Sequence, residues 1–208
     1  MISKKEFDNY CTNKSIVVVG NSRKILEKEN GEFIDSHDIV LRFNRGLPEG
    51  YEKHIGTKTD IWAINGRKKE TQKILHLKFQ DRKYTLWTFY KIGRLNPTLK
   101  YNTYHIPLDF YFKTCQDLNP TVEIIKKDLF FKDNMKGKRP TSGCVALYYL
   151  IKNIQYKSIT VTGFDFLQSF QFHSNDPIHL EKTHSGAKEK EFLTPLLENS
   201  RDINWLKL

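Results

Sequence analysis

The sequence lacks the hallmarks of several common classes of protein. Its 208 residues include only three cysteines, Cys11, Cys115 and Cys144, and no CxxC pair, so we expect three reduced thiols rather than a disulfide framework or a zinc site. No apolar run approaches the roughly 20 residues that cross a bilayer. The N-terminal segment MISKKEFDNYC has lysines but no apolar stretch behind them, which argues against a signal peptide and predicts a cytoplasmic protein.

The glycine-rich phosphate-binding motifs are absent as well. Neither GxGxxG nor GxxxxGK[ST] occurs, so the chain has no dinucleotide-binding fingerprint and no P-loop. There is also no internal repeat, low-complexity segment or linker. Hydrophobic residues make up 38% of the chain and charged residues 28%, as in ordinary globular proteins. We therefore expect residues 1–208 to form one domain with a core of its own.

Positive charge is in excess, with a formal net charge of +10. Three explanations compete: a solvated basic surface, attraction to an anionic nucleotide sugar or glycolipid at the inner face of the membrane, and nucleic-acid binding. Nucleic-acid modules usually concentrate lysine and arginine in one patch with interleaved aromatic residues. Here the basic residues are scattered, with short clusters at 67–69 and 136–139. We expect a solvated surface first, an anionic substrate or membrane second, and no nucleic acid.

Two short apolar runs near the N-terminus each end in polar residues. The run IVVV stops at Gly20, which is followed by Asn21 and Ser22, and a second run, IVLRFN, ends at Asn44. This pattern indicates buried parallel strands that feed tight turns at the carboxyl edge of a sheet, where ligands bind in open α/β folds. Glycine lets the backbone approach a ligand, and the amides after it can face an anion. The residues alone predict a generic nucleotide-binding edge.

A second informative stretch follows Arg139. Thr141, Ser142 and Gly143 precede a nearly all-apolar helix, expected over 144–154, and the strand after it closes at Gly163. Hydroxyl side chains and a glycine at a helix N-terminus bring free amides and the positive end of the helix dipole together, which suits an anion. An ordinary N-cap on a buried helix explains the same residues equally well.

Three histidines lie close together near the C-terminus. His173, His179 and His184 are separated by six and five residues, a spacing that matches no familiar helical or zinc-finger pair of metal ligands. Lone surface histidines are the plain alternative. We therefore expect no metal site here.

The rest of the chain predicts further α/β elements. The run within residues 57–65 reads as a third strand, and β-branched and aromatic residues indicate two more. Asn119 and Pro120 have the form of an N-cap followed by a first helical position, which predicts a helix over TVEIIKKDLFF. The segments expected to be regular are strands at 57–65, 84–89 and 103–106, and helices at 68–78 and 121–131.

Aromatic residues are dense between these strands. They include Trp87, Tyr90, Tyr101, Tyr104, Tyr111 and Phe112. Such rings either stack on sugars or bases or fill the core, and burial in the core is the more common outcome.

Taken in order, the quoted segments resemble the motifs of one family. VVVGNS, IDSHDIVLRFN and the GxxxD that begins at Gly56 look like the long sialylmotif of the animal-type sialyltransferases, glycosyltransferase family 29. The stretch from Arg139 to Asp165 resembles the short sialylmotif, with Pro-Thr-Ser-Gly in place of its usual Pro-Ser-Thr-Gly. His184 to Glu189 has the form HxxxxE of the family's last motif. The chain looks like a short, bacterial form of that family.

The resemblance implies a fold, a reaction and a site. The fold would be a single-domain, Rossmann-like α/β/α sandwich, a GT-A variant of the sialyltransferase type. The reaction would be inverting transfer of a keto-sugar acid from a CMP-activated donor to a glycan or glycolipid, without a cofactor or metal. His184 would act as general base and His173, with His179 as a rival, would stabilise the departing phosphate. The nucleotide-binding residues would be Gly20, Asn21, Ser22, Asn44, Thr141, Ser142, Gly143 and Gly163.

Two alternatives remain, one for the donor sugar and one for whether the protein is an enzyme. Sialic acid has the stronger precedent in the resembled family, but Kdo also travels as a CMP conjugate with a carboxylate on its anomeric carbon. A Kdo transferase of capsule or lipopolysaccharide synthesis, working at the inner face of the membrane, is therefore the second reading. A non-catalytic CMP-binding protein is a third, although the presence of HxxxxE argues against it.

A difference from the resembled family concerns its disulfide. The vertebrate members are secretory and join their long and short motifs through a disulfide. The corresponding positions here are Ile16 and Ile154. Two apolar residues that pack together would suit a reducing compartment.

Overall fold

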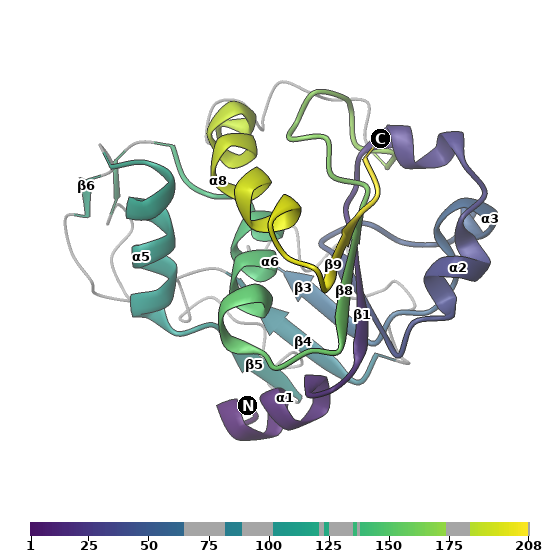
Figure 1. Cartoon of the computed structure of the whole chain (residues 1–208), viewed down its shortest axis with the longest axis horizontal. Coiled ribbons are helices and arrows are strands. Elements are labelled where there is room, and N and C mark those ends of the chain that lie inside the picture. Colours follow the sequence, from purple (N-terminus) through teal and green to yellow (C-terminus); the bar gives the residue numbers. More distant parts are fainter. Residues whose placement is uncertain are drawn as a thin grey trace.

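The core of the protein is a parallel β-sheet of seven strands (Figure 1). The computed structural model describes residues 1–64, 82–88, 102–120, 123–124, 135–136, 138–173 and 184–207, and the structure below is that of these residues. The strand order is β5-β4-β3-β2-β1-β8-β9, and every neighbouring pair is parallel. The strands are β1 (Ser15–Val19), β2 (Ile39–Phe43), β3 (Ile61–Ile64), β4 (Tyr84–Trp87), β5 (Thr103–His105), β8 (Ser158–Thr162) and β9 (Ile203–Trp205).

Helices cover both faces of the sheet, which explains why β1 and β2 are apolar at almost every position. On one face, Ile16 and Val18 pack in a core cluster with α1 (Lys4–Cys11), α5 (Leu108–Leu118), α6 (Ser142–Asn153) and α8 (Gly186–Glu198). On the other, Val17 and Val19 pack with η1 (Arg23–Glu27), α2 (Gly31–Asp35) and α3 (Glu52–Ile55). Figure 1 shows α5, α6 and α8 on one side of the strands and α2 and α3 on the other, with α1 at the bottom of the view. The expected three-layer α/β arrangement is thus confirmed, while its assignment to the GT-A variant stays a prediction.

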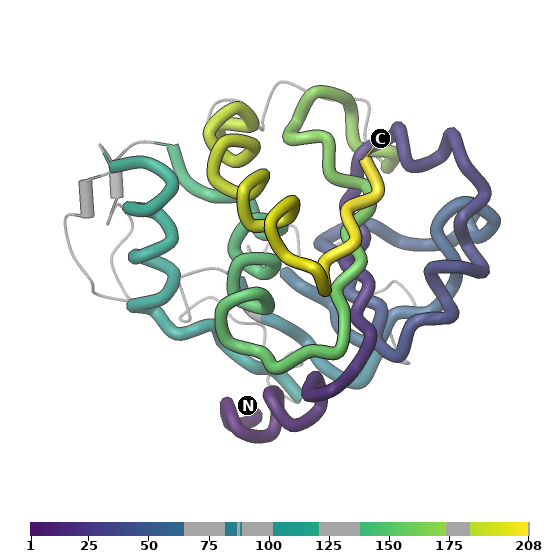
Figure 2. Tube along the Cα trace, in the orientation of Figure 1, coloured from purple at the N-terminus to yellow at the C-terminus, as the bar shows by residue number. Residues whose placement is uncertain are grey.

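The sheet has one topological switch point, and it lies beside β1. The strand pairs with β2 on one side and with β8 on the other, in the registers Ile16↔Ile39 and Ile16↔Ile159. From β2 onward the chain builds the sheet in one direction, and β8 and β9 extend it in the other (Figure 2). Crevices at such points, beyond the carboxyl ends of the strands, are where open α/β sheets bind ligands.

The predicted helix over 121–131 is wrong where the structure describes it. Residues Glu123–Ile124 form β6, which pairs antiparallel with β7 (Met135–Lys136). Asn119 is the C-cap of α5 instead of an N-cap, and its amide donates to the carbonyl of Cys115. Proline is common just beyond a helix C-terminus because it cannot continue the helix, so Asn-Pro marks an end here. The sequence-based prediction did not include α5.

Other predicted elements are largely confirmed. Strands at 61–64, 84–87 and 103–105 lie within the expected segments. Of the aromatic residues, Tyr104, Tyr111 and Phe112 are buried in the core, as expected, and the hydroxyls of Tyr104 and Tyr149 are 2.7 Å apart. The helix expected at 68–78 falls outside the described residues, as do Tyr90 and Tyr101.

All three cysteines are buried and unpaired, as predicted. Burial raises the pKa of Cys11 and of Cys115 to about 12, so neither thiol is a reactive nucleophile near neutral pH. Ile16 and Ile154 are both buried in the same core cluster, and direct packing of one against the other stays a prediction. Among the described residues, no helix has both the length and the apolar character needed to cross a membrane.

Candidate functional site

Two glycine turns meet at the carboxyl ends of β1 and β8. The amide of Gly20 donates to Thr162 O at 2.7 Å, and that of Ser22 donates to Gly163 O at 3.0 Å. A Cβ on Gly20 would lie 2.2 Å from Gly163 O, and one on Gly163 would lie 2.5 Å from Gly20 O. Gly163 also has a φ of +73°. Both positions need glycine because the two turns touch each other at the topological switch point.

The two asparagines predicted to share one rim lie together. The Asn21 side-chain amide donates to Phe43 O, the residue before Asn44, at 3.2 Å. Asn44 has a left-handed φ of +46°, and its carbonyl accepts from the indole N–H of Trp62. A Cβ on Gly46 would lie 2.2 Å from Asn21 Oδ1, so this glycine leaves room for the asparagine. The end of β1 and the end of β2 are thereby joined.

A segment that ends at His173 packs against the same turn. The Phe172 amide donates to Asn21 O at 3.0 Å, and Phe172 O accepts from the Tyr51 hydroxyl at 3.2 Å. The Ser22 hydroxyl lies 3.0 Å from that of Ser169 and accepts from the Lys24 amide. Ser22 thus serves as the cap of η1, with its amide and hydroxyl both bonded within the protein.

His173 itself is partly buried beside Arg45. Its Nδ1 is buried and has no hydrogen-bond partner among the described residues. Burial first, and the positive charge of Arg45 second, lower the pKa of His173 to about 4. The ring is therefore neutral at physiological pH, and the charge at this point of the site is that of the arginine. Sequence reasoning did not select Arg45, although it directly follows Asn44.

The N-terminus of α6 opens toward these turns. Thr141 is its N-cap, and the threonine hydroxyl accepts from the Cys144 amide at 3.1 Å. The Val145 amide donates to Thr141 O. The amides of Ser142 and Gly143 have no acceptor among the described residues. Amides at the positive end of a helix dipole are groups that suit an anion, so these two are the candidates for such a contact.

One aromatic ring connects α6 to the β1 turn. A Cβ on Gly143 would lie 2.9 Å from the Phe164 ring, and one on Gly20 would lie 2.7 Å from it. Phe164 also packs edge-on against Phe43, with ring centroids 5.9 Å apart. This ring was missed by sequence reasoning, although it directly follows Gly163 at the end of a predicted strand.

His184 and Glu189 bind the chain just before α6. His184 Nδ1 lies 2.8 Å from Arg139 O, and because a carbonyl only accepts, Nδ1 carries the proton. Glu189 is 4% exposed, and its oxygens accept from the Thr141 amide at 2.6 Å and from the Thr141 hydroxyl at 2.8 Å. Burial raises the pKa of Glu189 to about 7, against the lowering effect of these two hydrogen bonds.

The predicted site residues therefore form one connected region around the switch point. Contacts within the protein link β2 to the β1 turn, the β1 turn to α6 through Phe164, and α6 to the start of α8 through Glu189. His173 enters from the segment after β8, and His184 enters from the start of α8. His179 lies outside the described residues. In the part of the chain that is described, no cluster of three or more His, Cys, Asp or Glu side chains is arranged to hold a metal.

Comparison with known proteins identifies the family. The model of glycosyltransferase family 29 (sialyltransferase) matches residues 3–201, nearly the whole chain. The protein belongs to glycosyltransferase family 29. The family expected from the sialylmotifs is thereby confirmed.

Similar proteins cover the chain to different extents. A type 2 lactosamine alpha-2,3-sialyltransferase of Pan troglodytes is 26% identical in an alignment of 227 positions that covers 96% of this chain and 66% of that protein. The beta-1,6-galactosyltransferase GALT29A of Arabidopsis thaliana is 47% identical over 51 residues, 24% of this chain and 13% of its own. A crystal structure of a mammalian sialyltransferase superposes with a TM-score of 0.66 at 18% identity, covering 94% of this chain and 69% of that one, and supports the fold. This chain thus spans 66% of the length of the first of these relatives.

Proposed function

We propose that this member of the sialyltransferase family transfers sialic acid from CMP-sialic acid to a hydroxyl of a glycan or glycolipid, with inversion at the anomeric carbon. The observation that supports the proposal most is the hydrogen bond between His184 Nδ1 and the carbonyl of Arg139, which holds the ring next to the N-terminus of α6. A base and an anion-binding helix end are the two parts that attack by a hydroxyl and departure of a phosphate require.

His184 is suited to the role of general base. Because Nδ1 donates its proton to Arg139 O, the lone pair of the neutral ring is on Nε2. A histidine titrates near the working pH, so Nε2 takes the proton of the acceptor hydroxyl as that oxygen attacks the anomeric carbon. The C–O bond to the CMP phosphate breaks in the same step, and the phosphate leaves with the bonding electrons.

The leaving phosphate gains negative charge and needs donors. The amides of Ser142 and Gly143 supply two at the positive end of α6. Asn21 and Asn44, joined at the ends of β1 and β2, would hold the ribose and phosphate. His173, neutral by its lowered pKa, serves as a hydrogen-bond donor, and Arg45 beside it supplies the positive charge. With these donors we expect no metal requirement, which transfer assays with and without EDTA would test.

The relatives support sialic acid as the donor sugar. One is named as a sialyltransferase that acts on type 2 lactosamine, and it matches 96% of this chain. The match to a protein named as a galactosyltransferase covers only 24% of the chain, but it means that family membership alone leaves the sugar open. CMP-Kdo, which shares the carboxylate at its anomeric carbon, is the competing CMP donor.

The test is nucleotide release from CMP-sialic acid, CMP-Kdo and UDP-galactose in parallel. Each donor is offered with N-acetyllactosamine, with crude lipopolysaccharide, and with no acceptor. We expect acceptor-dependent CMP release from CMP-sialic acid that is lost in His184→Ala. Release from CMP-Kdo or UDP-galactose alone would replace the proposed donor. CMP binding without transfer from any donor would favour the non-catalytic reading, and no CMP binding would refute the proposal.

A further inference from the structure

We infer that Glu189 is a positioning residue that couples the base, His184, to the anion-binding end of α6. The inference rests on the proposed function, because it gives the histidine and the helix end their roles. Glu189 is buried and its carboxylate is bonded to Thr141, so it acts through other groups and does not itself touch the substrate.

Two contacts join residues 139–141, the segment just before α6, to the region where α8 begins. His184 binds the carbonyl of Arg139, and Glu189, five residues later, binds the amide and hydroxyl of Thr141, two residues after that arginine. Between them, the Glu189 amide donates to Ser185 O in the first turn of α8. Residues 139–141 therefore cannot shift relative to α8 without breaking a contact at one end or the other. The base, His184, and the N-terminus of α6 are therefore held in a fixed geometry relative to each other.

The same carboxylate determines which amides of α6 face a ligand. Glu189 takes the amide of the N-cap residue itself, and the Thr141 hydroxyl, oriented by Glu189 Oε2, takes the Cys144 amide. The amides between them belong to Ser142 and Gly143, which are the two that the proposal assigns to phosphate. Without Glu189, the Thr141 amide and hydroxyl lose the acceptor that fixes them, so the cap beside these two amides is no longer held in one geometry.

Using a buried carboxylate to hold the first turn of a helix costs folding free energy. A threonine N-cap needs no partner behind it, and burying an ionised group costs free energy unless its hydrogen bonds compensate. The raised pKa of Glu189 indicates that they do not compensate fully. A group that opposes folding, yet fixes Thr141 while His184 holds Arg139, has a function in positioning rather than in stability.

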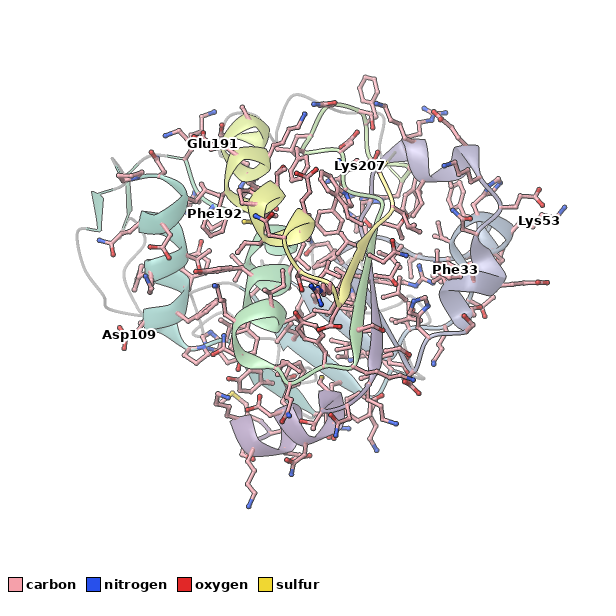
Figure 3. All side chains as sticks on the ribbon, viewed as in Figure 1. Phe33, Lys53, Asp109, Glu191, Phe192 and Lys207 are labelled. Atoms are coloured by element: carbon pink, nitrogen blue, oxygen red, sulfur yellow. The ribbon has the colours of Figure 1, made fainter. Side chains whose placement is uncertain are left out.

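The experiment compares Glu189→Ala and Glu189→Gln with Glu191→Ala. Glu191 lies on the same helix and is exposed (Figure 3), so its loss is a matched control. CMP affinity is measured by calorimetry, kcat and KM by transfer, and integrity by thermal unfolding. We expect Glu189→Ala to weaken CMP binding about 10-fold or more and to lower kcat about 10- to 100-fold, as for the loss of charged hydrogen bonds. Glutamine, which retains an acceptor for the Thr141 amide, should restore part of both.

A double-variant comparison separates coupling from general damage. If Glu189 acts on the rate through His184, Glu189→Ala should lower kcat little further in a His184→Ala background, while CMP affinity still falls. Wild-type CMP affinity and kcat in Glu189→Ala would overturn the inference. So would a full additional loss of kcat in the His184→Ala background, or a loss that tracks unfolding in both Glu189 variants.

Failure of the proposed function gives results that differ from failure of the Glu189 coupling. If the wild-type protein binds CMP but transfers no sugar, the proposed reaction fails, while CMP affinity in Glu189→Ala against Glu191→Ala still decides whether the carboxylate orients the helix end. If the wild-type protein does not bind CMP, both the proposed function and the coupling are refuted. An active wild type with an unaffected Glu189→Ala refutes the coupling alone.

Discussion

Replacing Glu189 by glutamine should change how the stability of the protein depends on pH. The carboxyl group has a pKa of about 7 in the folded protein and 4.5 as its ordinary value. The folded state thus binds more protons than the unfolded state between these two values. By linkage, the contribution of Glu189 falls as pH rises through that window and is least favourable above pH 7.

The magnitude follows from the shift. At 1.36 kcal/mol per pKa unit, ionising this buried group costs the folded state about 3 kcal/mol, of which about 2–3 kcal/mol develops between pH 5 and pH 8. Glutamine does not titrate, so Glu189→Gln should gain that amount relative to wild type across the same interval. The gain is expected even though the variant is a poorer enzyme.

Urea denaturation at pH 5, 6, 7 and 8 measures this difference, with Glu191→Gln as the control. The comparison must be between variants because His173 has the opposite sign. Its pKa falls from 6.5 to about 4 on folding, so its contribution is present above pH 6.5 and lost as pH falls toward 4. Parallel stability profiles for wild type and Glu189→Gln would refute the assignment of a raised pKa to Glu189.

Further predictions concern the base, the cation and the glycine turn. His184→Ala should lower transfer about 10²–10⁴-fold in steady-state assays while the calorimetric affinity for CMP stays at the wild-type value; retained transfer would remove His184 from the base role. Arg45→Met should raise the pKa of His173, followed by NMR titration, because the arginine charge is one cause of its lowering; an unchanged pKa would contradict their proximity. Gly163→Ala should destabilise the protein by about 1–3 kcal/mol in urea, and by more than Gly50→Ala, because both have positive φ but only Gly163 meets another backbone. Equal losses would show that φ strain alone matters.

Much of the sheet could be predicted because each buried parallel strand is recognisable from its own short stretch of sequence. Strands covered on both faces must be apolar at nearly every position, so the runs that became β1, β2 and β8 stand out without any knowledge of their neighbours. The polar residues after each run were rightly placed at one edge, since parallel strands end on the same side. Asn21 and Asn44 illustrate this.

Helix boundaries in the middle of the chain could not be predicted in the same way. Asn119-Pro120 is compatible with a helix that begins there and with one that ends there, because asparagine caps both termini and proline is tolerated at the first turn and just beyond the last. Packing decided the matter: Phe112, Cys115 and Leu118 are buried against the core that includes α6, so α5 precedes the pair.

The sequence by itself determined the α/β class, the strand edge that carries the site, and the family to which the chain belongs. Only the tertiary structure decided what individual residues do there: that Gly20 and Gly163 touch each other, that Ser22 caps η1, and that Glu189 holds Thr141. The physical reason is the separation in sequence of the residues that interact. Strand patterns reflect burial, which each residue records locally, whereas Thr141 and Glu189 are 48 residues apart and their hydrogen bonds exist only once α6 and α8 have packed together.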